Sequence, residues 1–403
     1  MNFLYKTIYL LLALVLAFPA DSYAQTAALS LNDAIEQALL QNLGLKSAQQ
    51  KVEAARAMVP MGFNLDKTEV FYRHDQNDIA ENGYANRVLG IGQSMQFPTI
   101  YASQRRVFQD ILLVEQQQFS LTQNQIIKEV SQTYYTIVYL QKLEDNYRFL
   151  DSLYQQFSLA AERRYELGET NYLEKLTARS KMRELAVRLA QTGESKAQAF
   201  VRLEQLIQMG KDIEIPEQEL LPLPIQTMDW ENHPGMRYFQ ESVNLKEDNL
   251  YLEKQRLLPD LHGEFFRGTN TGPNARVYPG FQVGVSVPLW FGAQKAKINA
   301  SKFELSEVSL ASENYSFQLE NKRKQLEIEL RKFQEAISFY NDEGKQLSRQ
   351  LVTQGDLAYR GGEIDFFQYV LLIENSRNIE VDYLINLQSY NMTVLEINYL
   401  INP

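Results

Sequence analysis

Residues 130–157 read VSQTYYTIVYLQKLEDNYRFLDSLYQQF, and an apolar side chain recurs there every three or four residues. That spacing places one apolar stripe along a helix, as in coiled-coil packing. After Pro98 the chain reaches Tyr165 without a glycine or proline, so the helix is expected to continue through this whole span. At about 1.5 Å per residue it would measure roughly 100 Å. Such a helix cannot be buried in a compact globule, so it must pack beside its neighbours in an extended bundle or tube.

A second stretch of the chain carries the same kind of apolar stripe. Its helix is expected to follow Pro288, as the first follows Pro98. The apolar residues of this second stripe are Leu326, Leu330, Phe333, Ile337, Tyr340, Leu347 and Leu351.

Three motifs recur in the same order in both halves, which predicts a duplicated chain. The first two pairs are 190 residues apart and the third 194, a drift of about one helical turn, as expected for an insertion inside a helix. The pairs are residues 42–46 and 232–236, Pro98 with Gln104 and Pro288 with Gln294, and Tyr165-x-x-Gly168-Glu169 and Tyr359-x-x-Gly362-Glu363.

The duplication divides the chain into two repeats, 25–210 and 229–403, each expected to contain a helix, two strands, a long helix and a returning helix. Residues 211–228, which hold three prolines, are the expected linker. We expect strands within about 68–97 and 261–289, and long helical hairpins at about 98–210 and 290–401. The first helices are predicted at Leu31–Val59, capped by Ser30 or Asn32, and at Asp229–Leu258, and the returning helices at Tyr172–Met209 and Phe366–Ile401.

The residues just before each long helix alternate with period two. In 89–97 and 281–289 the odd positions are mostly apolar, and the even positions, apart from Pro288, are glycine, serine or glutamine. This pattern predicts strands with one apolar face and one small or polar face. Weaker partner strands are expected at about Thr68–Asp75 and Leu261–Gly268.

The apolar face of this sheet has two interpretations: packing on helices in a soluble protein, or contact with lipid. The uncharged polar face and the aromatic residues Phe97, Trp290 and Phe291 at the strand ends favour lipid. A sheet in lipid must close, and known barrels start at about eight strands, so two or three copies would have to supply eight or twelve. The residues expected to face lipid are Leu89, Ile91, Met95, Phe281, Val283, Val285 and Val287.

The composition argues against several functions. A net charge of −10 over 403 residues argues against nucleic-acid binding. The chain contains no cysteine, and its three histidines lack metal-site spacing. The glycine patterns match neither a dinucleotide loop nor a nucleophile elbow. We therefore expect no catalytic residue, cofactor or bound metal.

The N-terminal segment 1–24 is typical of a secretory signal peptide. Lys6 is followed by an apolar run at 8–18 and by Ser22-Tyr23-Ala24, a small-x-small cleavage site. The protein is therefore expected to be exported and to have no membrane-spanning helix.

These motifs together resemble the TolC-like outer-membrane efflux proteins across essentially the whole chain after residue 24. The match comprises LSLNDAIEQALLQN at 29–42, GVSVPLWFG at 284–292 and the two Tyr-x-x-Gly-Glu turns. The resemblance implies a mainly α fold in which a homotrimer forms a twelve-stranded outer-membrane barrel continued by a periplasmic α-helical tunnel. It also implies two partners, a periplasmic adaptor (a membrane fusion protein) and an inner-membrane pump, with substrate leaving passively through the tunnel.

The subclass rests on the two strand-to-helix junctions, 96–101 and 288–295. They resemble those of outer-membrane components of heavy-metal RND systems of the CusC/CzcC type, which implies metal cations as cargo. Multidrug efflux and type I protein secretion are alternatives, and a periplasmic coiled-coil structural or adaptor protein is a distant one. Lipidated family members carry a cysteine after the signal, and this chain has none, so anchoring would rest on the barrel alone.

The resemblance also implies functional residues near the two turns. The expected adaptor-docking residues are Tyr165, Gly168, Glu169, Tyr359, Gly362 and Glu363; the two tyrosines could instead brace their own hairpins. The family's acidic pore-entrance positions fall here on Gln368 and Leu371, a departure from the pattern. The pore-entrance candidates are therefore Asp365, Gln368 and Glu374.

Overall fold

The computed structural model describes residues 27–76, 83–210, 213–226 and 233–401, which are mostly helical with a four-stranded sheet and a two-stranded one. They form two compact units. The hairpin unit holds Ile126–Pro224, Glu329–Leu395 and the described part of Met1–Asn42. The sheet unit holds Leu43–Gln125, Ile225–Ile328 and the described part of Glu396–Pro403. The predicted signal peptide at 1–24 lies outside the described residues.

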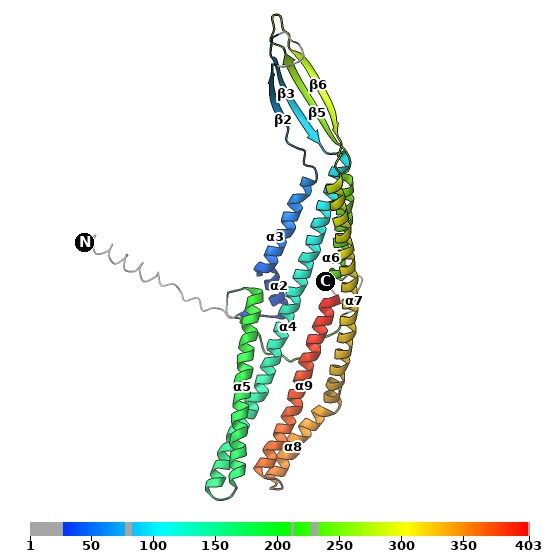
Figure 1. Ribbon diagram of the computed structural model, residues 1–403. Coiled ribbons are helices and arrows are strands. Elements are labelled where there is room, and N and C mark those ends of the chain that lie inside the picture. The colour runs from blue at the N-terminus through cyan, green and yellow to red at the C-terminus, as the bar shows by residue number, and fades with distance from the viewer. Residues whose placement is uncertain (1–26, 77–82, 211–212, 227–232, 402–403) are drawn as a thin grey trace, which may run out of the picture. The chain divides into compact units, whose positions relative to one another are not determined.

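Two helical hairpins build the hairpin unit (Figure 1). Helix α4 (Pro98–Glu166) runs for 69 residues without interruption, and α5 (Tyr172–Ile207) returns beside it. The second hairpin joins α8 (Lys345–Arg360) to α9 (Phe366–Ile401), and both turns lie at the same end of the unit. The unbroken α4 follows from the absence of glycine and proline in its interior.

The core of the hairpin unit lies between α4, α5 and α9. Phe157 of α4 is 1% exposed, and its ring centroid lies 5.3 Å from that of Phe366 and 5.7 Å from that of Phe367. Because these contacts join the first hairpin to α9, the cluster ties the two hairpins together. Its buried members are Leu150, Tyr154, Phe157, Ala161, Ala178, Leu185 and Val370.

Truncating this core is expected to destabilise the hairpin unit strongly. Phe157→Ala should lower the free energy of unfolding by about 3–5 kcal/mol, because it removes buried apolar area and leaves a cavity. Leu159→Ala, two residues further along and 64% exposed, is the control and should cost less than about 1 kcal/mol. Chemical denaturation followed by far-UV circular dichroism measures both, and equal losses would contradict the assignment of this core.

The second long helix is interrupted, unlike the continuous helix expected after Pro288. Helix α7 (Gly292–Phe339) passes into a π-helical turn, η2 (Tyr340–Gly344), before α8. In this turn Tyr340 stacks on Tyr383 of α9, with ring centroids 3.8 Å apart. A π-turn commonly kinks a helix, and Figure 1 shows the bend where α7 meets α8.

The helix predicted at Leu31–Val59 is also broken, into α2 (Leu31–Gln41), α3 (Leu43–Met58) and a short 3-10 turn, η1 (Val59–Gly62). Ser30 caps α2: its Oγ accepts from the Asp33 N–H and its own N–H donates to the Asp33 carboxylate, both at 3.2 Å. The break falls at Asn42, whose ψ of 116° is not helical. Its Nδ2 donates to the Leu206 carbonyl oxygen at 2.9 Å, so a long-range contact holds the break.

The counterpart helix α6 (Pro234–Gln255) begins after His233, whose side chain accepts from the Gly235 N–H at 3.0 Å. It ends three residues before the predicted Leu258. The predicted start at Asp229 lies outside the described residues.

The proline-containing segment between the repeats lies against the hairpin unit. Strand β4 (Ile213–Glu214) pairs in parallel with β1 (Ala27–Ala28). Further on, Asn391 of α9 accepts from the Leu223 N–H and donates to the Leu221 carbonyl, each at 2.9 Å. Side-chain amides thus satisfy backbone groups that have no partner in a helix or sheet.

Four antiparallel strands form the sheet, in the order β2-β3-β5-β6 (Figure 1). Strands β3 and β6 end earlier than predicted. After β3 the Gln96 N–H donates to the Tyr101 hydroxyl at 2.9 Å, and after β6 Pro288 has no N–H and restricts the preceding residue. Val287 therefore lies just outside β6. The strands are β2 (Glu69–Asp75), β3 (Asn86–Met95), β5 (Asp260–Thr269) and β6 (Tyr278–Ser286).

Candidate functional site

One face of the sheet is apolar and exposed in the single chain. Val70, Ile91, Phe265 and Phe281 stand opposite one another across the four strands, and cross-strand partners share a face. Val70 is 72% exposed and Phe281 81%. Of the predicted lipid-facing residues, Leu89, Ile91, Phe281, Val283 and Val285 are exposed on this face, Met95 is half-buried on it, and Val287 is exposed beyond the strand.

Sequence reasoning did not assign Val70, Tyr72 and Phe265 to the apolar face, although each is exposed on it. Alternation in β2 is masked by Phe71, an apolar residue on the opposite face. The available signal was the register: once Ile91 is placed on the apolar face, its partners Val70 and Phe265 follow.

The opposite face carries polar groups linked between neighbouring strands. Ser94 Oγ lies 3.0 Å from His262 Nδ1, and His262 Nε2 lies 2.9 Å from Glu264 Oε1. These contacts hold the Glu264 carboxylate, whose side chain is only 18% exposed, against the sheet. A polar face of this kind suits contact with water.

The two hairpin turns share one backbone geometry. Gly168 and Gly362 have φ of +77° and +73°, in the left-handed region that glycine enters without a Cβ penalty. The N–H of Glu169 donates to the Arg164 carbonyl at 2.8 Å, and that of Glu363 to the Ala358 carbonyl at 2.9 Å. Each glycine N–H donates to the carbonyl three residues back, so both turns are Schellman motifs.

The tyrosines at the turns pack within their own hairpins. Tyr165 contacts Tyr172 edge-on, with ring centroids 5.8 Å apart, and Tyr359 stacks on Tyr369 at 5.0 Å. Both remain partly exposed. The first turn also exposes Leu167 and Leu173, which the motif-based prediction did not include.

The three pore-entrance candidates have defined partners. Asp365 caps α9 together with Gln368: each side chain accepts from the other residue's backbone N–H, at 2.8 and 3.0 Å. Glu374 accepts from the Tyr154 hydroxyl and pairs with Lys181 Nζ at 3.2 Å, and its side chain is 14% exposed. Burial, with the hydrogen bond to Glu374, raises the pKa of the Tyr154 hydroxyl. Glu374 therefore links α9 to both helices of the first hairpin.

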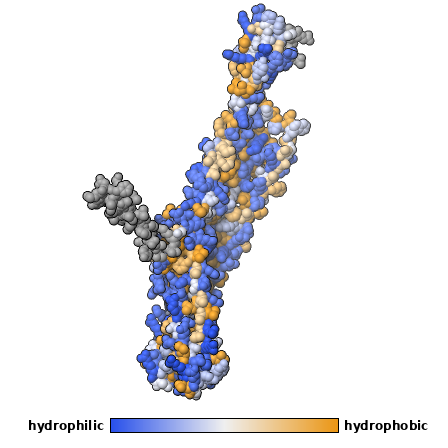
Figure 2. Space-filling model, turned by 90° about the vertical axis from the view of Figure 1, so that its left-hand side faces the viewer, coloured by the Kyte–Doolittle hydropathy of each residue, from blue (hydrophilic) through white to orange (hydrophobic). Residues whose placement is uncertain are grey.

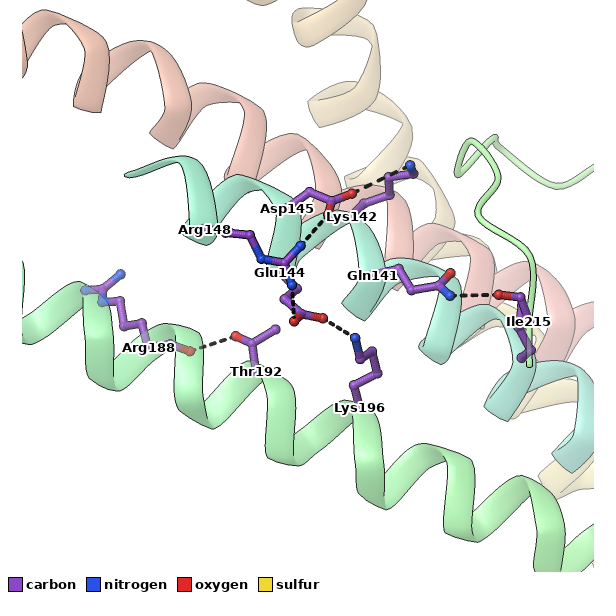
Figure 3. A network of polar contacts seen from close by, with 9 residues as sticks. All are labelled: Gln141, Lys142, Glu144, Asp145, Arg148, Arg188, Thr192, Lys196 and Ile215. Atoms are coloured by element: carbon purple, nitrogen blue, oxygen red, sulfur yellow. Dashed lines mark hydrogen bonds and ion pairs between the residues drawn. The ribbon is translucent and has the colours of Figure 1, made fainter. Parts of the chain in front are cut away.

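Charged side chains also connect α4 to α5 further along the hairpin (Figure 3). Glu144 accepts from Lys196 of α5 and from Arg148 one turn along α4, the latter at 2.6 Å. Because the Glu144 side chain is 15% exposed, this contact is screened less than an ordinary surface pair. On the face of the helices that Figure 2 shows, hydrophilic and apolar residues are mixed.

An acidic pair lies where α4 and α6 meet in the sheet unit. Asp110 Oδ2 is buried without a hydrogen-bond partner among the described residues. Burial, followed by the negative charge of Asp248, raises the pKa of the Asp110 carboxyl to about 6, and Arg106 opposes the shift.

Replacing Asp110 by asparagine is expected to stabilise the sheet unit at neutral pH. The pKa of Asp110 is higher in the folded chain than in the unfolded chain. The stability that this group contributes to the fold is therefore complete below about pH 4, and it is lost as the pH rises through about 6. Asp110→Asn removes that loss and should gain about 1 kcal/mol near pH 7, allowing for solvent screening. Chemical denaturation at about pH 4 and near pH 7 measures the free energy of unfolding of the variant and the wild type. The control is Glu247→Gln, at an exposed position of α6. An equal gain at both pH values would contradict the assignment.

Within the described part of the chain, no helix is both long and apolar enough to cross a membrane. Across those same residues, His, Asp and Glu nowhere gather in a group of three that could hold a metal ion.

No family model matches the chain, and no curated protein matches it. Solved structures do match. The chain is similar to CusC, whose structures concern folding and transmembrane channel formation, with a TM-score of 0.75 and 13% identity over 96% of each chain. It is similar to the outer-membrane channel OprN (TM-score 0.75, 15% identity, 92% of this chain and 89% of OprN). It is also similar to the outer membrane protein VceC from Vibrio cholerae (TM-score 0.72, 14% identity, 92% of this chain and 95% of VceC).

The chain therefore has the fold that CusC, the outer-membrane channel OprN and the outer membrane protein VceC share. The resemblance to the TolC-like proteins predicted from the sequence motifs is confirmed at the level of the fold. Identities of 13–15% support this likeness of fold alone.

Proposed function

We propose that the chain is the outer-membrane exit duct of a tripartite efflux system, acting as a passive channel and not as an enzyme. One observation carries this proposal: a sheet with an exposed apolar face leads directly into α4, an uninterrupted helix of 69 residues. In water such an apolar face would make copies of the protein associate with one another, whereas in a membrane it would lie against lipid and away from water. The fold of the outer-membrane channels supports the same interpretation.

The proposed assembly is a homotrimer. Three copies of the four-stranded sheet would close a twelve-stranded barrel in the outer membrane, with the apolar face toward lipid and the polar face toward the lumen. The helical hairpins would extend into the periplasm as a tunnel. This localisation agrees with the expected signal peptide at 1–24.

The proposed partners are a periplasmic adaptor and an inner-membrane RND pump. The adaptor would dock at the hairpin turns through Tyr165, Gly168, Glu169, Tyr359, Gly362 and Glu363. Exposed Leu167 and Leu173 would add apolar area to this surface. The assignment of Asp365, Gln368 and Glu374 to the pore entrance stays a prediction.

As cargo we propose metal cations, because the junctions at 96–101 and 288–295 resemble those of heavy-metal systems. The fold likeness to CusC agrees with this choice, but OprN and VceC match about equally well. Drug-like molecules or a secreted protein are the alternative cargoes. These cargoes are distinguished by comparing the growth of a deletion strain with that of the same strain complemented with this protein, on metal salts and on a panel of drugs.

The duct proposal is tested with the purified full-length protein. It predicts a detergent-extracted trimer by native mass spectrometry and discrete conductance steps in planar bilayers. Recovery of a monomer from the soluble fraction, without conductance, would contradict the proposal.

A further inference from the structure

The two β-hairpins of the sheet repeat one unusual packing arrangement on the polar face. In the first hairpin the Phe71 ring lies against Gly90, its direct partner on β3. In the second the Phe266 ring lies against Gly280, its direct partner on β6. A methyl group on either glycine would overlap the ring in this position, so each ring lies where only a glycine leaves room for it. The glycines are 190 positions apart, the offset that relates the two repeats, and the phenylalanines 195.

The same row of the sheet also joins the two hairpins to each other. Gly90, on the last strand of the first hairpin, stands opposite Phe266, on the first strand of the second. Phenylalanine and glycine therefore alternate across all four strands in the order Phe71, Gly90, Phe266, Gly280. The outer strands of the sheet are β2, which holds Phe71, and β6, which holds Gly280.

We propose that β6 of one copy pairs with β2 of the next in the register that the β3–β5 seam shows within one chain. Gly280 is the counterpart of Gly90, and Phe71 is the counterpart of Phe266, so Gly280 would stand opposite Phe71 of the second copy. This deepens the proposed function, on which it rests, by fixing which residues meet between copies. Such a head-to-tail interface closes into a ring when its rotation allows.

The side chains brought together in this register match on both faces. On the apolar face Phe281 meets Val70, both of which are exposed in the single chain. On the polar face Gln282 meets Glu69, an amide that can donate to a carboxylate. A shift by one residue would set apolar side chains against polar ones, because strand faces alternate.

Closure in this register would continue the alternating row around the whole sheet. Each copy contributes Phe71 and Phe266, with a glycine between successive rings, so the rings would form a continuous aromatic collar on the polar face. In the proposed barrel this collar would line the lumen.

The absence of cysteine makes the register directly testable by disulfide cross-linking in the full-length protein. Directly paired residues lie about 4.5–5.5 Å apart at Cα, within disulfide range, whereas diagonal partners lie about 7–8 Å apart. V70C/F281C should therefore give cross-linked oligomers on non-reducing gels. The register controls V70C/V283C and Y72C/F281C should give roughly tenfold less.

The chain supplies a matched positive control. Ile91 and Phe265 are the direct partners in β3 and β5 that correspond to Phe281 and Val70, so I91C/F265C should cross-link within one chain. The V70C and F281C single variants should cross-link to each other when they are co-expressed, and neither should cross-link when it is expressed alone. Cross-linking of F281C alone would indicate a two-fold β6–β6 contact and overturn the proposal.

A second cysteine pair is needed in case the substitutions of the first pair themselves disrupt assembly. E69C/Q282C tests the same register from the polar face and should also cross-link. If both pairs fail while native mass spectrometry shows an intact oligomer, the register is wrong and the duct proposal stands. If the cysteine-free protein itself is a monomer, the duct proposal fails instead.

Discussion

Val283→Asp is expected to abolish the assembled oligomer and to remove the protein from the outer-membrane fraction. Val283 lies in the middle of β6 and is 76% exposed on the apolar face. In the proposed barrel its carboxylate would have to enter lipid, at a cost on the order of 2 kcal/mol in each copy. Three copies multiply the cost, so the assembly should fail as a whole. Membrane fractionation and heat-resistance of the oligomer on gels measure the loss.

Gly284→Asp is the matched control for this prediction. It introduces the same carboxylate one residue later, on the polar face, where a Cβ meets only His262 at 3.9 Å. This variant should assemble normally. If Val283→Asp assembled as well as Gly284→Asp, the apolar face would not contact lipid, and the lipid-facing assignment would be wrong.

Replacement of the turn glycines is expected to stop export while leaving the oligomer in the membrane. Gly168→Val and Gly362→Val force a β-branched residue into the left-handed region, at a local cost of about 1–3 kcal/mol. Relief of this strain would break the two hydrogen bonds of the Schellman motif and displace the neighbouring Glu169 or Glu363. The proposed docking surface would then no longer match its adaptor. Complementation of export and cross-linking to the adaptor are the measurements.

Gly361→Ala provides the control at the second turn. Gly361 precedes Gly362 but has a right-handed φ of −74°, which alanine adopts readily. This variant should export at the wild-type rate. Normal export and adaptor cross-linking by both valine variants would show that the turns do not dock the adaptor.

Local sequence patterns were sufficient for most elements of the fold. The glycine-free span after Pro98 predicted α4, and the Tyr-x-x-Gly-Glu motifs predicted turns at which Gly168 and Gly362 adopt positive φ. The alternation at 281–289 predicted a strand with one apolar face, and β6 has one. These features depend on neighbouring residues only, through helix propensity, side-chain periodicity and the conformational freedom of glycine.

The candidate site was predictable in residue type but less so in arrangement. The hairpin turns and most of the apolar strand face were located from motifs and alternation. The exposure of Val70 and Phe265 required the register, which pairs strands distant in sequence. Sequence could not show that Glu374 is engaged by Tyr154 and Lys181, because those partners lie on other helices.

What the sequence determined by itself is therefore the unbroken length of α4, the positions of the hairpin turns and the presence of a two-faced sheet. Only the tertiary structure decided where these elements break and how they align. The helix break at Asn42 depends on the carbonyl of Leu206, 164 residues away, and the π-turn at Tyr340 depends on stacking against Tyr383. The alternating row of phenylalanine and glycine depends on the register between two hairpins. Each is set by a contact between residues far apart in the chain, which no window of neighbouring residues records.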